Sequence, residues 1–287
     1  MTVSIPATLS KFLWLAPVSA ALLMLAGCSN SADPVDSTAT DTTTAEAPIS
    51  IKIATESSYK PFSYTDADGK LIGYEVELVD ALCAQMQAEC EMISQDWDGL
   101  IPGLNAQKFD AVIAGMSITP ERQEVVEFTD PYFYTGIILI GKKGDDISVA
   151  SLDAQPIASQ RATVASQYLQ DKHPNADIKL YDTQDNAYLD LTSGRVRAMM
   201  SDKVTGIDWL KTEAGQDYEV KGDEISTDED AMGIAFRKGD PLVAKFNTAL
   251  AELKASGTYD QITGSYFGTS STAAAQNAVA TEATVSE

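Results

Sequence analysis

Residues 156–181 read PIASQRATVASQYLQDKHPNADIKLY and predict a strand, a helix and a second strand. The β-branched and small residues of 156–159 and 178–181 indicate strands, and 164–172 reads as a helix between them. The same alternation continues toward the C-terminus, with strands predicted at 198–201 and 232–236 and helices at 186–193, 202–211 and about 240–267. Repeated strand–helix alternation is typical of α/β proteins, in which helices cover mostly parallel sheets.

The alternation also runs through the preceding part of the chain and restarts after Gly144. Residues 49–53 alternate apolar and polar side chains as a strand does, and 66–69 reads as the turn of a hairpin. The remaining predicted elements here are a helix at 75–88, a helix capped by Asp98 that runs through Leu104, strands at 110–114 and 136–141, and a helix with Thr119 as its cap and Pro120 as its first residue.

Both ends of the chain read as segments outside the fold. Lys11 precedes the apolar run 12–26, which is too short to span a membrane comfortably and ends in Leu-Ala-Gly before Cys28. We therefore expect a lipoprotein signal peptide at 1–27, with Cys28 as the lipidated first residue; the alternative is an ordinary signal peptide followed by a chance cysteine. Residues 28–48 are expected to form a disordered tether, and 269–287 a disordered tail.

Such a protein would be exported and lipid-anchored to the cell envelope, on the periplasmic side of a bacterial membrane. Of the three cysteines, Cys83 and Cys90 then remain, and an oxidising compartment favours a disulfide between them. Two reduced core thiols are the alternative. The pair lacks the additional Cys or His residues that a zinc site needs.

Charge and composition exclude several classes of function. The 42 acidic and 20 basic residues give a formal net charge of -22. This charge repels phosphate backbones, which argues against nucleic-acid binding, and it tolerates small cations. The single histidine, His173, lies just beyond a predicted helix, and the sequence has no Gly-x-Ser-x-Gly elbow and no phosphate-binding glycine loop. We expect no catalytic residue, no metal and no cofactor, so binding is the leading class of function.

Four segments have the composition of a ligand pocket. Residues 55–62 follow the first strand, 96–102 place an aromatic side chain at a loop-to-helix junction, and 114–122 place small residues at a strand end before an arginine. Residues 201–202 occupy the equivalent strand end in the second half. Open α/β sheets bind their ligands beyond the carboxyl ends of the strands, so these segments predict one shared site.

These segments resemble the polar amino-acid-binding family of ABC importer solute-binding proteins (family 3), and most of all its arginine-binding receptors. The motifs are Gly-Tyr-Glu-Val-Glu-Leu at 73–78, Ile-Ala-Thr-Glu-x-Ser-Tyr-x-Pro-Phe at 53–62 and Ala-Gly-Met-x-Ile-Thr-Pro-Glu-Arg at 114–122. Further matches are Asp-Lys-His-Pro at 171–174, Asn-Thr-Ala-Leu at 247–250 and Gly-Thr-Tyr at 257–259. The resemblance covers about 49–267, and Cys83 and Cys90 match a disulfide of histidine- and lysine-type relatives.

The resemblance implies a type II periplasmic-binding-protein-like fold of class α/β. Two lobes joined by two crossing strands would hold the ligand in the cleft between them. Lobe 1 would comprise 49–135 and 232–268, and lobe 2 would comprise 136–231. The partners it implies are a small-molecule amino acid and the permease of an ABC importer, with the chain acting as a monomer and touching the membrane only through its lipid anchor.

The resemblance also assigns roles at the two charged ends of an amino acid. Arg122 would bind the ligand carboxylate bidentately, and backbone N–H groups and hydroxyls near Ser117 and Thr163 would add donors. Asp202 would accept from the α-ammonium group. The structural alternatives are a surface helix arginine for Arg122 and a helix N-cap for Asp202.

The side-chain end of the ligand would lie between two rings. Tyr59 and Trp97 match the aromatic pair that sandwiches a planar group in this family, and Glu56 matches the acid that meets a distal positive charge. Gly115 and Gln160 complete the predicted set. Ordinary core packing is the alternative for the two aromatic residues.

One segment departs from the family pattern. Relatives read Ser-Gly-Thr-Thr where this chain has Arg-Ala-Thr-Val at 161–164. An Arg161 that points into the pocket would favour an acidic or neutral ligand, whereas an Arg161 that points to solvent would change nothing.

The predicted function is therefore capture of L-arginine, or another basic amino acid, by lobe closure. The alternatives are a receptor for a neutral or acidic polar amino acid, a cyclohexadienyl dehydratase-like enzyme with Glu56 as general acid, and a sensory receptor that presents its ligand to a kinase.

Overall fold

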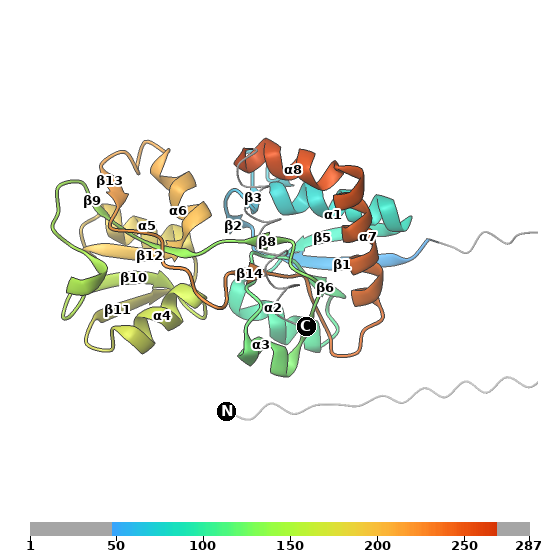
Figure 1. Cartoon of the computed structure of the whole chain (residues 1–287), viewed down its shortest axis with the longest axis horizontal. Helices are drawn as coiled ribbons and strands as arrows, with labels where there is room; N and C mark the ends of the chain where they lie inside the picture. The colour runs from blue at the N-terminus through green and yellow to red at the C-terminus, as the bar shows by residue number, and fades with distance from the viewer. Residues whose placement is uncertain (1–47, 269–287) are drawn as a thin grey trace, which may run out of the picture. The chain divides into compact units, whose positions relative to one another are not determined.

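The computed structural model describes residues 48–268 (Figure 1). The predicted signal peptide, Cys28, nearly all of the tether and the tail lie outside the described residues.

The first five-stranded sheet has the strand order β5-β1-β6-β15-β7. In this sheet, β1 (Ser50–Thr55) pairs in parallel with β5 (Glu89–Ser94) and β6 (Ala111–Val112). β15 (Ala235–Phe236) is antiparallel to β6 and to β7 (Glu127–Phe128). The sheet therefore combines strands from both ends of the described chain.

The second five-stranded sheet has the strand order β11-β10-β12-β9-β13. β10 (Pro156–Gln160) pairs in parallel with β11 (Asp177–Tyr181) and β12 (Ala198–Asp202). β9 (Ile137–Lys142) is antiparallel to β12 and to β13 (Tyr218–Val220). The predicted α/β class is confirmed, and the bodies built on these two sheets are called the first and second lobe below.

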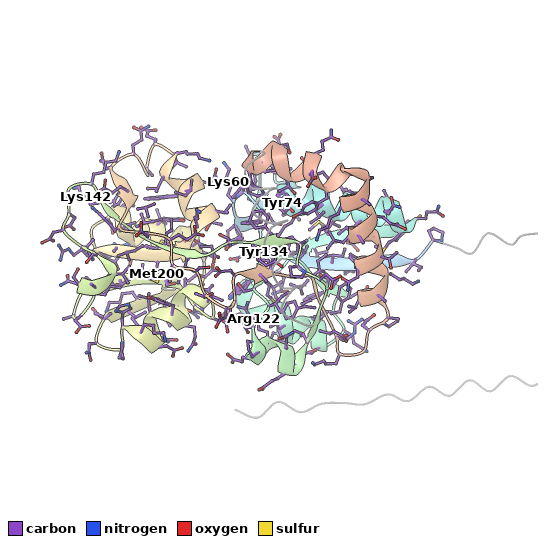
Figure 2. All side chains as sticks on the ribbon, in the orientation of Figure 1. Lys60, Tyr74, Arg122, Tyr134, Lys142 and Met200 are labelled. Atoms are coloured by element: carbon purple, nitrogen blue, oxygen red, sulfur yellow. A yellow bond between two sulfur atoms is a disulfide. The ribbon has the colours of Figure 1, made fainter. Side chains whose placement is uncertain are left out.

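Two smaller sheets complete the described strands. β8 (Phe133–Tyr134) pairs with β14 (Ala231–Met232), and β2 (Ser58–Tyr59), β3 (Ser63–Thr65) and β4 (Leu71–Ile72) form a hairpin sheet. Figure 2 labels Tyr134 on β8, with Tyr74 in the first lobe on one side of it and Met200 in the second lobe on the other. The residue limits of the lobes and the two crossing segments stay predictions.

Helices cover both faces of the first sheet (Figure 1). One face carries α1 (Tyr74–Met86), α7 (Leu242–Ser256) and α8 (Thr258–Phe267), and the other carries α2 (Leu100–Asn105), with α3 (Pro120–Val125) beside it. Successive side chains of a strand point to opposite faces, so Ile53 joins the core of α1 and α7 while Ala54 joins the core of α2. Phe246 of α7 is fully buried in the first of these cores.

The second sheet is covered in the same way. α4 (Val164–Lys172) lies on one face, and α5 (Gln184–Thr192) and α6 (Lys203–Leu210) lie on the other. Leu139 of β9 packs in the cluster that contains Leu169, whereas its neighbour Ile140 packs in the cluster that contains Leu191. Two short 3₁₀ helices, η1 (Trp97–Gly99) and η2 (Val149–Ser151), lie in loops.

The helix start at Thr119 is confirmed, because its side chain accepts from the Arg122 N–H and Pro120 is the first helical residue. The predicted cap at Asp98 is wrong. Trp97–Gly99 forms η1, and α2 then begins after Gly99 without a side-chain cap. The single strand predicted at 232–236 is two strands, β14 and β15, in different sheets.

A disulfide joins Cys83 at the end of α1 to Cys90 in β5, which confirms the predicted pair. It fixes the helix to the edge strand of the first sheet. Within residues 48–268, none of the helices is both long and apolar enough to span a bilayer.

Replacing both cysteines, as Cys83→Ser with Cys90→Ser, should lower the free energy of unfolding by about 2 kcal/mol, because the bond closes a loop with a sequence separation of 7 and restricts the unfolded chain. Urea unfolding of residues 48–268 measures this change. A thiol reductant should destabilise the wild type by a similar amount and leave the double variant unchanged. Equal stability of the two proteins would contradict the expectation.

Candidate ligand-binding site

All nine residues predicted to bind a ligand line one small cavity between the two lobes. They are Glu56, Tyr59, Trp97, Gly115, Ser117, Arg122, Gln160, Thr163 and Asp202, and Ala114 and Val164 complete the lining. Most of them lie at or just beyond the ends of β1, β5, β6, β10 and β12, so the carboxyl ends of parallel strands from both sheets face the cavity. The structure brings the predicted set together; what the set binds stays a prediction.

Asp202 contributes a buried carboxyl group from the second lobe. It is 9% exposed and occupies the N-cap position of α6, but its side chain makes no cap hydrogen bond. Instead it accepts a hydrogen bond from the hydroxyl of Tyr59, in the first lobe. Burial raises the pKa of Asp202 to about 6, although the Tyr59 hydrogen bond and the charge of Arg122 act in the opposite direction. The side chain is therefore aimed at the cavity rather than at its own helix.

Glu56 contributes a second carboxyl group, from the first lobe. It is 3% exposed, and Gln160 Nε2 of the second lobe donates to its two oxygens at 2.9 and 3.1 Å. Ser58 Oγ donates to it at 3.2 Å. Burial raises the pKa of Glu56 to about 7 against the lowering effect of these hydrogen bonds. Near neutral pH the group lies close to the point where its proton is gained or lost.

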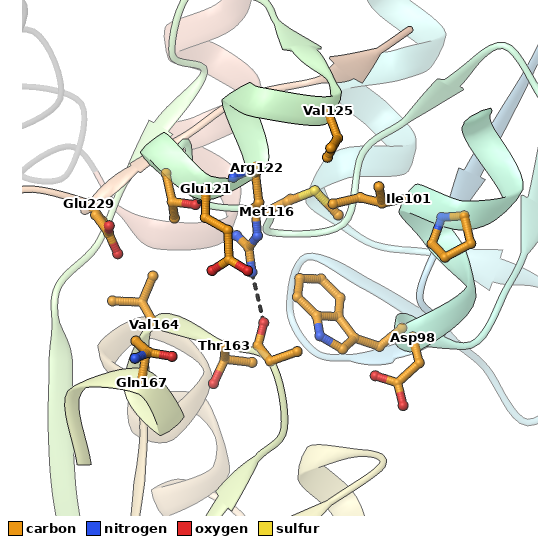
Figure 3. A pocket seen from close by; sticks show the side chains of 14 residues that line it. Asp98, Ile101, Met116, Glu121, Arg122, Val125, Thr163, Val164, Gln167 and Glu229 are labelled. Atoms are coloured by element: carbon orange, nitrogen blue, oxygen red, sulfur yellow. Dashed lines mark hydrogen bonds between the residues drawn. The ribbon is translucent and has the colours of Figure 1, made fainter. Parts of the chain in front are cut away.

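Arg122 brings the positive charge of the cavity. Its Nη1 donates to the Ser117 carbonyl at 2.8 Å, and its Nη2 donates across the lobes to the Ala162 carbonyl at 2.9 Å, the bond drawn in Figure 3. The guanidinium carbon lies 5.3 Å from the ring centroid of Trp97, within cation–π distance. Burial lowers the pKa of Arg122, yet an arginine keeps its proton in proteins. Arg122 is thus a partly buried cation of the cleft and not a surface helix arginine.

Tyr59 and Gly115 are fitted to each other. The Tyr59 ring is 4% exposed and stacks on Phe62 with centroids 5.5 Å apart. Gly115 has a φ of 56°, and a Cβ added there would lie 2.3 Å from the Tyr59 ring. Only glycine combines this backbone conformation with this approach.

Glu75 supports this wall of the cavity, and the sequence reasoning missed that role. The Gly115 N–H donates to Glu75 Oε1 at 2.6 Å, and Ser63 Oγ donates to its other oxygen at 2.7 Å. Tyr132 donates its hydroxyl to Glu75 as well, so the fully buried carboxyl group has three donors. An acidic residue inside the apolar stripe of a predicted helix was the available signal. Burial nonetheless raises the pKa of Glu75.

The donors predicted at Thr163 are engaged within the second lobe. Its Oγ1 accepts from the Ser166 N–H and donates to the Gln160 carbonyl, and its own N–H donates to Ser166 Oγ. This capping box fixes the start of α4. Ser117 is buried, and its carbonyl is held by Arg122.

Arg161 does not point into the cavity. Its guanidinium group pairs with Asp182 at 2.5 Å and with Asp98 at 3.4 Å, and its side chain is 42% exposed. The charged groups that line the cavity are therefore Arg122, Glu56 and Asp202. The Arg-Ala-Thr-Val sequence at 161–164 therefore adds no positive charge to the cavity, where two carboxyl groups still face one guanidinium group.

Two larger open regions adjoin the cavity. One, of about 440 Å³, lies on the Arg122 side, and Glu121, Glu229 and Gln167 also line it (Figure 3). The other, of about 640 Å³, shares Glu56 and Trp97 with the cavity. Among the described residues, no cluster of His, Cys, Asp and Glu could hold a metal ion.

Comparison with known proteins identifies the family. The sequence model of the bacterial extracellular solute-binding proteins, family 3, matches residues 51–269. The chain belongs to this family. The predicted resemblance is thereby confirmed.

Curated proteins that are similar to this chain include two from Escherichia coli K12. The putative ABC transporter arginine-binding protein 2 is 38% identical over 228 residues, covering 78% of this chain and 93% of its own length. The lysine/arginine/ornithine-binding periplasmic protein is 34% identical over 256 residues, covering 86% of this chain and 95% of its own length.

Among solved structures, an ancestral arginine-binding protein bound to arginine superposes with a TM-score of 0.72 at 35% identity. The superposition covers 76% of this chain and 98% of that protein. The expected type II two-lobe fold is confirmed by this likeness.

The raised pKa of Glu56 sets a pH dependence of stability. The folded state binds this proton more tightly than the unfolded chain, so the free energy of unfolding should fall as pH rises from 4.5 to about 7. The shift corresponds to a loss of about 3 kcal/mol, which Glu56→Gln should remove. Urea unfolding from pH 4.5 to 7.5, without added amino acid, measures both proteins. Parallel curves for the two would contradict this assignment.

Proposed function

We propose that this protein is an exported receptor that captures a basic amino acid, L-arginine above all, and delivers it to the permease of an ABC importer. The observation that carries the proposal is the charge arrangement of the cavity. One guanidinium group, Arg122, faces two buried carboxyl groups, Glu56 and Asp202, and two aromatic rings border the space between them. A ligand with one acid group and two cationic groups balances this set, whereas glutamate or glutamine leaves a carboxyl group uncompensated.

In the proposed complex, each end of arginine replaces a bond that the protein now makes with itself. The ligand carboxylate takes the place of the Ala162 carbonyl on Arg122, in the bidentate geometry that a guanidinium group favours. The α-ammonium group binds Asp202 in competition with Tyr59, and the distal guanidinium group binds Glu56 in competition with Gln160. Exchange of one hydrogen bond for another costs little, so the new charge pairs supply the net gain.

The ring faces add selectivity for a planar cation. Tyr59 and Trp97 line the cavity from the first lobe, and a cation over such a face gains about 0.5–2 kcal/mol per contact. A bound cation also favours the ionised form of Glu56, since opposite charges stabilise each other at short range. Arginine and lysine should therefore hold Glu56 in its carboxylate form.

Ligand capture in this proposal closes the cleft. Arg122 and Glu56 belong to the first lobe and Asp202 and Gln160 to the second, so only a closed cleft presents all of them to one ligand. A ligand shifts a conformational equilibrium only by its better contacts in one state, and contacts to both lobes provide that difference. The permease would then receive the closed, loaded form.

The relatives support the same ligand class and location. Two of them are named for arginine or for lysine, arginine and ornithine, and one of these is named as periplasmic. We propose that the chain is exported, is anchored by a lipid on Cys28, acts as a monomer and binds its ligand without converting it. Turnover of prephenate or arogenate by the purified protein would instead indicate an enzyme with Glu56 as its general acid.

Asp202→Ala should weaken arginine binding by at least about 100-fold, because the α-ammonium group would enter a buried site without its anion. Isothermal titration calorimetry on the mature domain measures the affinity. Asp177→Ala, which removes an exposed carboxylate of β11 paired with Lys179, is the matched control and should bind normally. Near-normal affinity of the Asp202 variant would refute the assigned role.

Glu56→Gln should weaken binding of arginine and lysine far more than binding of glutamine, since only the basic ligands present a charge to Glu56. Competition against a labelled basic amino acid gives the three affinities in the same experiment. Equal losses for all three ligands would show that the distal end of the ligand lies elsewhere.

A further inference from the structure

Arg161 is a charged side chain beside the cavity that has no role in the proposed function. It follows Gln160 directly at the end of β10, and its backbone N–H donates to the Tyr181 carbonyl at 2.9 Å. Its guanidinium group makes a 2.5 Å ion pair with Asp182, which belongs to the same lobe. The backbone hydrogen bond and this carboxylate together fix the orientation of the guanidinium group.

The guanidinium group of Arg161 is directed toward the first lobe. Arg161 Nη1 is 3.4 Å from Asp98 Oδ2, and Asp98 stands next to Trp97 in η1. The three residues Asp98, Arg161 and Asp182 form a link between the lobes that is called the mouth bridge here. Asp98 lines both open regions beside the cavity, and Asp182 lines one of them. The mouth bridge thus lies at the edge of the cavity, because Asp98 directly follows Trp97 and Arg161 directly follows Gln160 in the chain.

We propose that Arg161 sets the residence time of the ligand, because the mouth bridge must break before the cleft opens. This inference rests on the proposed function and extends it to the rate of release. An ion pair between groups that the open state separates stabilises the closed state alone, so all of its energy opposes opening. The side chains of Arg161, Asp98 and Asp182 are 42%, 51% and 68% exposed, respectively. Water therefore screens each ion pair, and the effect on opening is modest.

A second electrostatic effect acts in the same direction. Asp98 and Asp182 come from opposite lobes and both pair with one guanidinium group. Without Arg161, closure would bring these two carboxylates together with no cation between them. Like charges repel, so loss of Arg161 both removes an attraction and leaves a repulsion across the closed cleft.

A competing explanation predicts that Arg161 has the opposite effect on the release rate of the ligand. Arg161 adds a positive charge near a site for a cationic ligand, and simple repulsion would make the ligand leave faster while Arg161 is present. The mouth bridge predicts faster release without Arg161, and ligand repulsion predicts slower release. One rate measurement separates them.

The test measures the dissociation rate of arginine by stopped flow, with tryptophan fluorescence as the signal, in Arg161→Gln and the wild type. We expect release to be about two- to fivefold faster in Arg161→Gln at low ionic strength. The ratio of the two rates should approach one in 1 M NaCl, where charges more than about 3 Å apart are screened. Arg195→Gln is the matched control, because Arg195 pairs with Asp190 inside the second lobe, and its release rate should equal that of the wild type.

A double-mutant cycle separates the bridge from a general change in structure. Asp98→Asn should speed release in the wild-type background, yet leave it unchanged or slow it in the Arg161→Gln background, where it removes the repulsion from Asp182. Additive effects, an unchanged rate or slower release in Arg161→Gln would overturn the proposal. Calorimetry on the wild type is done before any rate is measured. If the wild type binds no basic amino acid, the proposed function fails and not the mouth bridge.

Discussion

Two buried carboxyl groups that need partners from opposite lobes are the constraint on which the cleft depends. Asp202 of the second lobe is held by Tyr59 of the first, and Glu56 of the first lobe is held by Gln160 of the second. A carboxyl group taken out of water without a partner costs several kcal/mol. Each lobe therefore supplies the partner that the carboxyl group of the other lobe would otherwise lack, and in the proposed complex the charges of the ligand replace these partners.

Around this pair the rest of the site is arranged as support. Glu75 fixes the Gly115 backbone through a hydrogen bond, and Gly115 in turn leaves room for the Tyr59 ring. The capping box of Thr163 fixes the end of β10, which carries Gln160. The polar groups that meet the cavity are thus positioned by others buried behind them, which reduces the rearrangement needed on binding.

Much of the fold could be predicted from the sequence because local pattern and tertiary structure agree. The helix predicted at 164–172 has the observed bounds, and the cap at Thr119 follows from residue types within four positions. The prediction failed where distant pairing decides. Residues 232–236 look like one strand locally, but β14 pairs with β8 whereas β15 pairs with β6 and β7. The short strand β7 exists only through such pairing.

The site shows the same division. Glu56, Arg122 and Asp202 are predicted because they match a family pattern, and the structure brings them together. The partners that they hold cannot be predicted from that pattern. Whether Arg161 points into the cleft depends on Asp98 and Asp182, which lie 63 and 21 positions away in the chain and meet only in the folded structure. Glu75 belongs to a recognisable motif, but its supporting role cannot be predicted from it, because its three hydrogen-bond donors come from separate segments of the chain.

The strand order of the two sheets has a consequence for the order of assembly. All five strands of the second sheet lie between residues 137 and 220, so a continuous stretch of chain suffices to build it. The first sheet inserts β15, at residues 235–236, between β6 and β7, and its core needs α7 and α8. A chain that emerges N-terminus first can therefore complete its second lobe while the first still waits for its final segment, since distant contacts close last.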